Sequence, residues 1–496
     1  MHELKVTGGA VVDGTGAPPR ECEVAVSGGR ITEVGPSVGP AHQVIDTAGL
    51  LVAPGFIDPH SHACGQGIGA VLHAPTAPSA ICQGVTTLVT GMCGYSPLEI
   101  GAHYDAVAKQ GAAVNYALLI GHNAVRQQVL EQRAQAPTDL ELARMRSLVR
   151  IAMEQGAHGL SSGLWYVPGA YAETEELIEL TREVAPFGGL YASHIRGEDA
   201  ESGPAALEEA ITIGREAGAP VQVAHLKAAE RPAWGQGPQR LERLERAQAE
   251  GVDVHADAYP YDASATGLAV CLPPEAFEGV GLRTRLQDPD NARRYRAHVT
   301  GRLERLGGPD RVLITAAHRT DVTGKRLDEA ARLMGTEPED AIISLVLGGS
   351  TSAVYFAMDQ ADVDRIVVHP LVMIGSDSSV RRPGEGMCHP RTWGTFPRVL
   401  ARYARELGTL SWGGAIHKMT AQPAAKFGLQ DRGVLREGAW ADIVVLDPQT
   451  VGDRATYDAP HTAPVGICTV LVNGVRVVDG GQVTGARPGH VLRRGR

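Results

Sequence analysis

Eight short apolar segments between residues 55 and 377 constrain the fold of this chain most strongly. They lie at 55–62, 86–93, 115–122, 159–166, 190–194, 221–225, 252–259 and 372–377. Several are separated by amphipathic stretches with helical periodicity, at 138–155, 173–185, 204–217 and 239–250. Eight strand–helix units in about this length predict a (β/α)8 barrel, with a doubly wound open sheet as the alternative.

The two ends of the chain share a different pattern. Both alternate apolar and polar residues between glycine turns, which is typical of small antiparallel sheets. Neither end has enough strands for a stable sandwich by itself. We therefore expect residues 1–50 and 430–496 to form one β-sandwich domain, and residues 51–429 to form the barrel. The stretch 266–345 is longer than a crossover needs and predicts an inserted small subdomain.

Composition limits the possible partners and the compartment. A net charge of −10 argues against nucleic acid or an anionic membrane as the main partner. The chain has no run of 18 apolar residues, and its first residues lack the basic start and apolar core of a signal peptide. Seven cysteines, an odd number in a long chain, make a disulfide framework a poor expectation and favour the cytoplasm. A monomer and a small homo-oligomer both fit the sequence.

Most of the expected strands end in a polar residue that could bind or react. These residues are His60 and His62, Cys93, His122, Tyr166, His194, His225, Asp257 and Asp377. The carboxyl ends of parallel strands in a barrel open onto one face, so we expect these side chains to converge. A helix-capping role explains any single one of them, but it does not explain so many histidines together with a cysteine.

The pair His60 and His62 indicates a metal site, because two strand residues with one residue between them point to the same face. Histidine, cysteine and aspartate together favour zinc over magnesium or calcium. The candidate ligands are numerous enough for a binuclear site: His60, His62, Cys93, His194, His225 and Asp377. The alternatives are two ordinary loop histidines and a cysteine that is only a small buried apolar residue. Cys64 is a possible competing ligand.

Asp377 is the best candidate for handling protons. A carboxylate beside a metal site can take a proton from water and deliver it to a leaving group, although a helix cap or a pure ligand is the simpler role. Arg391 and Arg398 follow closely and could grip a carboxylate, with a surface position the better expectation for Arg398. Tyr166 and Tyr259 could polarise a carbonyl or pack as an aromatic lid.

A series of motifs in a fixed order gives the chain a family resemblance. The motifs are GGAVVDGTG, PGFIDPHSH, GMCGYSP, SSGLWYVPG, SHIRGE, AHLK, IGSDSS, HPRTWGTFPR and GVLREGAWADIVVLDP. The set resembles the amidohydrolase superfamily, and within it the N-acyl-D-amino-acid deacylases, over nearly the whole chain. The resemblance implies a metal-dependent barrel, a β-sandwich from both termini and an inserted domain. It also implies hydrolysis of the amide bond of N-acyl-D-amino acids to a carboxylate and a free D-amino acid.

The resemblance also implies roles for individual residues. Cys93, His194 and His225 look like a tight zinc site, and a second, weaker site would combine bridging Cys93 with His60, His62 and Asp377. Asp377 resembles the general base and acid. Lys227, Tyr259 and Arg391 match the family positions that hold the substrate carboxylate. Tyr166 matches the position that polarises the scissile carbonyl.

Two segments depart from the family pattern. The run HSHACG lacks the acidic residue usual soon after the histidine pair, and SSVRRPGEGMC after Asp377 is longer. Both could contact the substrate. A cyclic-amide hydrolase, such as a hydantoinase or dihydroorotase, is the alternative within the superfamily. It is disfavoured because Cys93 stands where those enzymes use a carbamylated lysine. A catalytically inactive barrel that serves as a binding protein is the alternative from another class.

Overall fold

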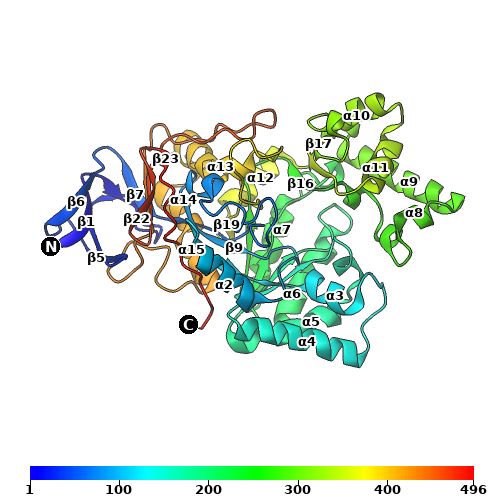
Figure 1. Cartoon of the computed structure of the whole chain (residues 1–496), viewed down its shortest axis with the longest axis horizontal. Helices are drawn as coiled ribbons and strands as arrows, with labels where there is room; N and C mark the ends of the chain where they lie inside the picture. The colour runs from blue at the N-terminus through cyan, green and yellow to red at the C-terminus, as the bar shows by residue number, and fades with distance from the viewer. Residues whose placement is uncertain (496) are drawn as a thin grey trace.

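Eight parallel strands form a barrel at the centre of the computed structural model, which describes residues 1–495 (Figure 1). A parallel bridge between Ser61 and Ser378 joins the first strand's end to the last. The third strand is interrupted and carries two labels. In chain order the strands are β8 (Phe56–Asp58), β9 (Val85–Thr90), β10 (Asn115–Leu118) with β11 (Ile120–Gly121), β12 (Gly159–Gly163), β13 (Leu190–His194), β14 (Val221–Val223), β15 (Val254–Ala258) and β19 (Val372–Ile374).

The barrel strands are almost entirely buried because both of their faces are covered, although several contain polar residues. Ile57 and Val89 belong to a cluster inside the barrel, whereas their neighbours Phe56 and Leu88 pack outward in the larger core beneath the helices. All six residues of β9 are buried. Every strand segment expected from the sequence is present, and the predicted barrel is confirmed.

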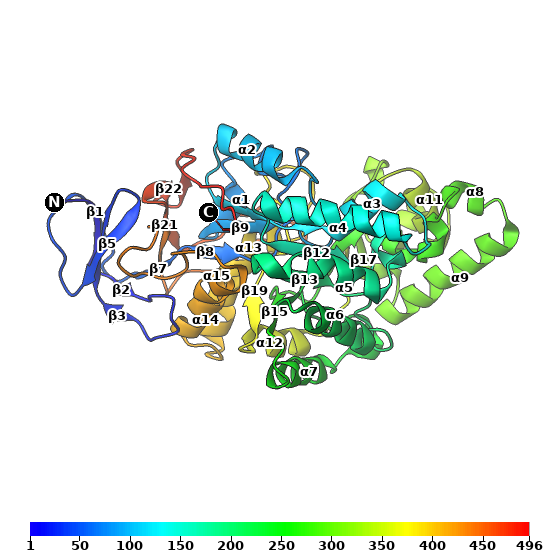
Figure 2. The same cartoon turned by 90° about the horizontal axis from the view of Figure 1, so that it is seen from below.

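Helices cover the outside of the barrel (Figure 2). The four helices expected from periodicity are α4 (Asp139–Glu154), α5 (Thr174–Arg182), α6 (Gly203–Ala217) and α7 (Gly237–Ala249). The others around the barrel are α1 (Pro78–Ile81), α2 (Ile100–Gln110), α3 (His122–Leu130), α12 (Gln360–Val368), α13 (Arg391–Arg398), α14 (Trp412–Met419) and α15 (Ala421–Phe427). Within residues 1–495, no helix has both the length and the apolar character to cross a bilayer.

Both termini contribute to the β-structure at the left of Figure 1. One four-stranded sheet has the order β5 (Arg30–Gly35), β4 (Glu23–Ser27), β1 (His2–Thr7), β6 (Ala41–Asp46). A seven-stranded sheet has the order β23 (Gln482–Val483), β22 (Val475–Asp479), β21 (Ile467–Val472), β20 (Ile443–Leu446), β7 (Leu51–Pro54), β2 (Ala10–Val11), β3 (Arg20–Glu21).

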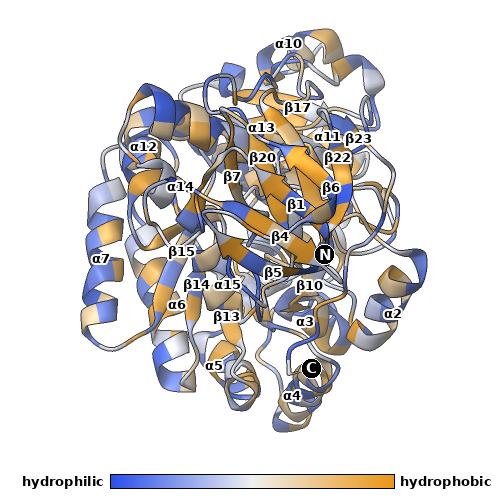
Figure 3. Cartoon of the chain, turned by 90° about the vertical axis from the view of Figure 1, so that its left-hand side faces the viewer, coloured by the Kyte–Doolittle hydropathy of each residue, from blue (hydrophilic) through white to orange (hydrophobic). Residues whose placement is uncertain are grey.

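The antiparallel pairing of β7 with β20 joins the two ends of the chain, as predicted. Strands such as β20 are strongly hydrophobic (Figure 3), and one apolar cluster includes residues from β1, β4, β7 and β20. The sheets are mixed rather than purely antiparallel, since β1 pairs in parallel with β6 and β2 in parallel with β7.

An inserted unit lies at the opposite end of the molecule from the terminal sheets (Figures 1 and 2). Its strands form an antiparallel sheet in the order β16 (Ser264–Gly267), β18 (Ser352–Tyr355), β17 (Val312–Ala316). Its helices are α8 (Gly281–Arg285), α9 (Pro289–Leu306), α10 (Leu327–Met334) and α11 (Pro338–Leu347). The sequence boundaries of the three units stay a prediction.

Candidate active site

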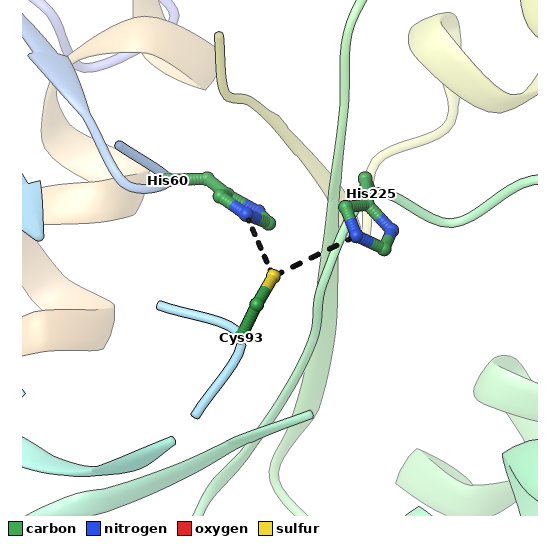
Figure 4. A group of neighbouring side chains, drawn as sticks. All are labelled: His60, Cys93 and His225. Atoms are coloured by element: carbon green, nitrogen blue, oxygen red, sulfur yellow. Dashed lines mark hydrogen bonds between the residues drawn. The ribbon is translucent and has the colours of Figure 1, made fainter. Parts of the chain in front are cut away.

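Cys93 lies at the centre of a cluster of histidines at the carboxyl ends of the barrel strands. Its Sγ is 3.5 Å from Nε2 of His60 and 3.8 Å from Nε2 of His225 (Figure 4). The same His225 nitrogen is 2.8 Å from Nδ1 of His194. All four side chains are buried. Three histidines from three other strand ends therefore gather around Cys93, and two of them contact its sulfur directly.

Asp377 brings the histidine pair into the same cluster. Its Oδ1 is 2.9 Å from Nε2 of His62 and 3.3 Å from Nε2 of His60. His60, His62 and Asp377 form one compact donor group, and Cys93, His60 and His225 form a second. His60 belongs to both groups, so the two could hold neighbouring ions.

The backbone turns sharply where these ligand candidates leave the strands. Cys93, His225 and Asp377 have left-handed φ angles of 54°, 35° and 48°. Non-glycine residues occupy this region at an energetic cost, and such positions cluster at functional sites. Gly94 is required beside Cys93, because a Cβ there would lie 2.0 Å from Oδ1 of Asn123.

Two buried carboxylates contact the Nδ1 atoms of His60 and His225, the ring nitrogens that do not face Cys93. Asp257 Oδ1 lies 2.9 Å from His60 Nδ1 and accepts the backbone N–H of His225 at 2.8 Å. Glu198 Oε1 lies 3.1 Å from His225 Nδ1 and accepts from the Lys227 ammonium at 2.7 Å. Such carboxylate–histidine pairs orient metal ligands. Asp257 was noticed in the sequence only as a strand-end residue. Glu198 was missed, although it stands in SHIRGE four residues after His194.

The charges around Cys93 and Asp377 favour the deprotonated forms of both side chains. Burial raises the pKa of the Cys93 thiol, but nearby histidines, chiefly His60, outweigh burial and hold that pKa well below its usual range. Burial also raises the pKa of Asp377, but Arg391, His60 and His225 hold it well below its usual range. A thiolate and a carboxylate are the forms that bind metal.

The donor set fits a transition metal ion. It combines a thiolate, imidazole nitrogens and a carboxylate, the ligand types of zinc. His194 Nε2 is buried and has no hydrogen-bond partner in the protein, an uncommon condition for a buried nitrogen. The nitrogen of His194 that faces the cluster is Nδ1, which lies 2.8 Å from His225 Nε2, and the same His225 nitrogen is 3.8 Å from the Cys93 sulfur, so the donor atoms converge as metal ligands do.

A cavity of about 650 Å³ opens beside the cluster and is lined by His62, Cys93 and Asp377. Arg391 Nη1 lies 2.8 Å from Asp377 Oδ2, and its guanidinium is 4.6 Å from the centre of the Tyr259 ring. The hydroxyl of Tyr259 is buried without a partner. Further lining residues are Tyr166, Lys227, Tyr259, Arg391, Thr266 and Leu272.

Tyr166 stands between the cluster and the inserted unit. Its ring centre is 4.8 Å from that of His194, and its hydroxyl is 3.0 Å from Oγ1 of Thr266 in β16. The insertion therefore forms one wall of the cavity.

Several candidates from the sequence lie elsewhere. Arg398 pairs with Asp453 at 3.1 Å, and His122 pairs with Glu176 at 2.7 Å beneath α3. Cys64 Sγ faces a backbone carbonyl at 3.6 Å. These three residues are not among the described residues that line the cavity.

The two segments that depart from the family pattern lie side by side: the backbone N–H of His62 donates to the carbonyl of Ser378 at 2.8 Å. The loop that follows the first segment also contacts the second, since His73 Nε2 and Glu385 Oε1 are 2.5 Å apart. Neither His73 nor Glu385 lines the cavity. The expectation that these segments could contact the substrate stays a prediction.

Comparison with known proteins gives the family. The family model described as "Amidohydrolase family" matches residues 43–478. The chain belongs to the amidohydrolase family. A family relative, the D-aminoacylase of Alcaligenes xylosoxydans xylosoxydans, is 39% identical over 99% of this chain and 98% of its own.

Solved amidohydrolase structures resemble the chain over its whole length. The N-acyl-D-glutamate deacylase of Bordetella bronchiseptica, solved with zinc and a phosphonate mimic of the tetrahedral intermediate, matches with a TM-score of 0.85 and 37% identity over 99% of both chains. A D-aminoacylase described with a binuclear metal centre matches with a TM-score of 0.86 and 37% identity over 100% of both chains.

Proposed function

We propose that this protein is a zinc-dependent N-acyl-D-amino-acid deacylase. It hydrolyses a linear amide to a carboxylate and a free D-amino acid. The observation that carries the proposal is the position of Asp377, whose two oxygens face the histidine pair on one side and Arg391 on the other. A metal site and a carboxylate-binding arginine thus meet at a single proton-accepting group.

The residues that would hold the metal all belong to the buried cluster around Cys93. We assign the tighter site to Cys93, His194 and His225, and a second, weaker site to Cys93 with His60, His62 and Asp377. A bound zinc ion supplies Lewis acidity that lowers the pKa of water to about 7 and polarises a carbonyl oxygen.

The protein's own groups would bind the substrate and move the protons. Arg391, Lys227 and Tyr259 would hold the α-carboxylate, which fixes the amide beside Asp377. Tyr166 would donate a hydrogen bond to the carbonyl oxygen as negative charge develops on it. Asp377 would accept the proton of the attacking water and then deliver it to the nitrogen of the leaving amine.

The preference for the D-isomer is supported by the relatives, two of which act on D-amino-acid derivatives by name. The partner is accordingly a small N-acyl amino acid, and we expect neither nucleic acid nor a membrane to be needed. All seven cysteines are free, which supports our proposal of a reducing cytoplasmic location.

A cyclic-amide hydrolase is the second candidate. A hydantoin lacks the free α-carboxylate that Arg391 would bind, so the buried pair of Arg391 and Asp377 favours a linear substrate over a hydantoin. Dihydroorotate keeps such a carboxylate, and against it the linear substrate is supported by the relatives: three deacylases are 36–39% identical to this chain, whereas a dihydroorotase is 25% identical.

The test is a panel of N-acetyl-D-amino acids, their L-enantiomers and hydantoin, assayed on one preparation whose zinc content is measured by elemental analysis. We expect turnover of the D-series, little of the L-series and none of hydantoin, with about one zinc or more per chain. Turnover of hydantoin alone, or full activity in a metal-free preparation, would reject the proposal.

A further inference from the structure

Glu198 contacts both a metal-ligand candidate and a substrate-binding candidate. It lies in the loop after β13, and its side chain is 6% exposed. One oxygen, Oε1, lies 2.7 Å from the Lys227 ammonium and 3.1 Å from His225 Nδ1. The metal half and the substrate half of the site therefore share a single carboxylate oxygen.

The main chain fixes the position of Glu198 relative to these two residues. The backbone carbonyl of Glu198 accepts from the N–H of Ala229 at 2.9 Å and from Nη2 of Arg240 at 2.8 Å. Arg240 also donates to the backbone carbonyl of Lys227. Because Arg240 is 3% exposed and bonds to both loops, the main chain of Glu198 is held next to that of Lys227 without any ligand.

His225 can bind a metal through only one of its nitrogens. Nε2 faces Cys93 and His194, whereas Nδ1 faces Glu198 and Lys227. A ligating imidazole must have a free lone pair on Nε2 and therefore carry its proton on Nδ1. A carboxylate acceptor at Nδ1 stabilises that tautomer.

Lys227 opposes this tautomer. Its Nζ is 2.7 Å from the same Nδ1, and an ammonium is a donor only. If Lys227 donates to Nδ1, the histidine proton must move to Nε2, where it blocks the metal. Glu198 Oε1 is within reach of both groups, 2.7 Å from Lys227 Nζ and 3.1 Å from Nδ1. A carboxylate there draws the ammonium to itself and accepts a proton from Nδ1, so it competes with Lys227 for this nitrogen.

We propose that Glu198 is a positioning residue that favours the metal-binding tautomer of His225 by competing with Lys227 for Nδ1, and thereby couples metal affinity to recognition of the substrate carboxylate at Lys227. The first half concerns metal binding alone. The second half rests on the proposed function, because it takes Lys227 as a ligand of the substrate.

The test measures the zinc dissociation constant by competition with a chromogenic chelator at pH 7.5. Glu198→Gln should bind zinc about 10- to 100-fold more weakly, since loss of a ligand's carboxylate partner has effects of this size. Glu230→Gln is the matched control: Glu230 is also a buried carboxylate that lines the cavity, but it pairs with Arg305 at 2.6 Å in the insertion. Glu230→Gln should change the zinc dissociation constant by less than about threefold, a smaller change than the loss of a ligand's carboxylate partner produces.

The double variant Glu198→Gln with Lys227→Met separates the tautomer mechanism from general disruption. Removing the competing ammonium should recover at least about fivefold in zinc affinity, a substantial part of the loss expected above. No recovery, or an unchanged constant in Glu198→Gln, would overturn the proposal.

If Glu198→Gln does not fold, Lys227→Met alone decides. It should bind zinc as tightly as the parent or more tightly, while KM for N-acetyl-D-amino acids rises; weaker zinc binding overturns the proposal. The dissociation constant needs no substrate, so a failure of the proposed function on the substrate panel leaves this test standing.

Discussion

Two buried polar clusters lie at opposite ends of the barrel and differ in how completely the protein satisfies them. At the amino end of β10, Asp442 accepts from the side chain of Arg432, from the amide of Asn115 at 3.0 Å and from the backbone of Asn473 at 2.8 Å. The amide of Asn473 donates to Asn115 at 2.8 Å, which closes a ring. No side-chain atom of these four residues is buried without a partner.

The cluster at the carboxyl ends of the strands is satisfied less completely. His194 Nε2 and the Tyr259 hydroxyl are buried without partners, and three of its residues have left-handed backbones. The cluster around Asp442, in which every buried polar side-chain atom has a partner, is a closed network that joins the barrel to the terminal sheets. The cluster around Cys93 is an open network, because some of its polar atoms are left without a partner in the protein. The distinction between a structural and a reactive cluster therefore rests on hydrogen-bond satisfaction, because both contain buried charges.

Removal of the proton acceptor from the open cluster should have the largest effect. We expect Asp377→Asn to lower kcat about 10³-fold, because positioned acids and bases contribute about 10²- to 10⁴-fold. Zinc bound at the site of Cys93, His194 and His225 should be retained. Steady-state kinetics with elemental analysis check this, and near-normal turnover would reject the assignment.

Disruption of the closed cluster should affect stability and not chemistry. Asp442→Ala leaves the buried guanidinium of Arg432 without its carboxylate, and the free energy of unfolding should fall by about 3 to 5 kcal/mol. Urea denaturation measures the loss. At a temperature where the variant is folded, kcat and zinc content should match the parent. A selective loss of zinc would contradict the structural role of this cluster.

The sequence predicts the barrel well because its strands carry a strong local signal. Segments such as 86–93 are short, rich in β-branched residues and free of charge, and the order of the strands along the chain is their order around the barrel. The predicted ends were too long: β8 ends at Asp58 and β14 at Val223, two residues before His60 and His225. The left-handed turns that follow have no local pattern of their own, apart from the glycines around Cys93.

Other features of the site and the fold could not be predicted, because they depend on contacts between residues that are far apart in the sequence. Glu198 becomes important only because the fold brings it to Lys227 and His225, about thirty residues away. The sequence already favours Cys93 over Cys64, from its position between glycines after a β-rich segment, and the structure places Cys93 beside His60 and His225. The parallel pairing of β1 with β6 joins strands that are separated along the chain by four others, and alternation of polarity does not reveal strand direction.

Arg391 tests whether the open cluster recognises a carboxylate. Arg391→Ala should raise KM for N-acetyl-D-leucine about 10- to 100-fold, since a hydrogen bond to a charged group contributes about 1.5 to 3 kcal/mol. KM for the uncharged N-acetyl-D-leucinamide should change little. Arg398→Ala is the control, because Arg398 lies in the same helix but pairs with Asp453. Equal changes for both substrates would reject carboxylate recognition.

The smallest predicted effect concerns Lys418, a buried cation near the amino end of β19 that has no carboxylate partner among residues 1–495. Its ammonium donates to the backbone carbonyl of His369, and burial lowers the pKa of Lys418 to about 7. Lysine in an unfolded chain titrates near about pH 10.4, so between these values the unfolded state binds more protons and stability rises with pH. Below about pH 7 the folded state must bury the full charge.

Lys418→Met should therefore raise Tm by a few degrees at pH 6.5 and by less at pH 9.5, when differential scanning calorimetry is run at both values. The carbonyl of His369 keeps its bond from the N–H of Val372 at 3.0 Å, so the substitution leaves no unpaired acceptor. The control is Lys109→Met, which removes the same charge from an exposed position on α2 and should show no dependence on pH. A gain that is equal at both pH values would mean that better apolar packing, and not the buried charge, explains the effect of Lys418→Met.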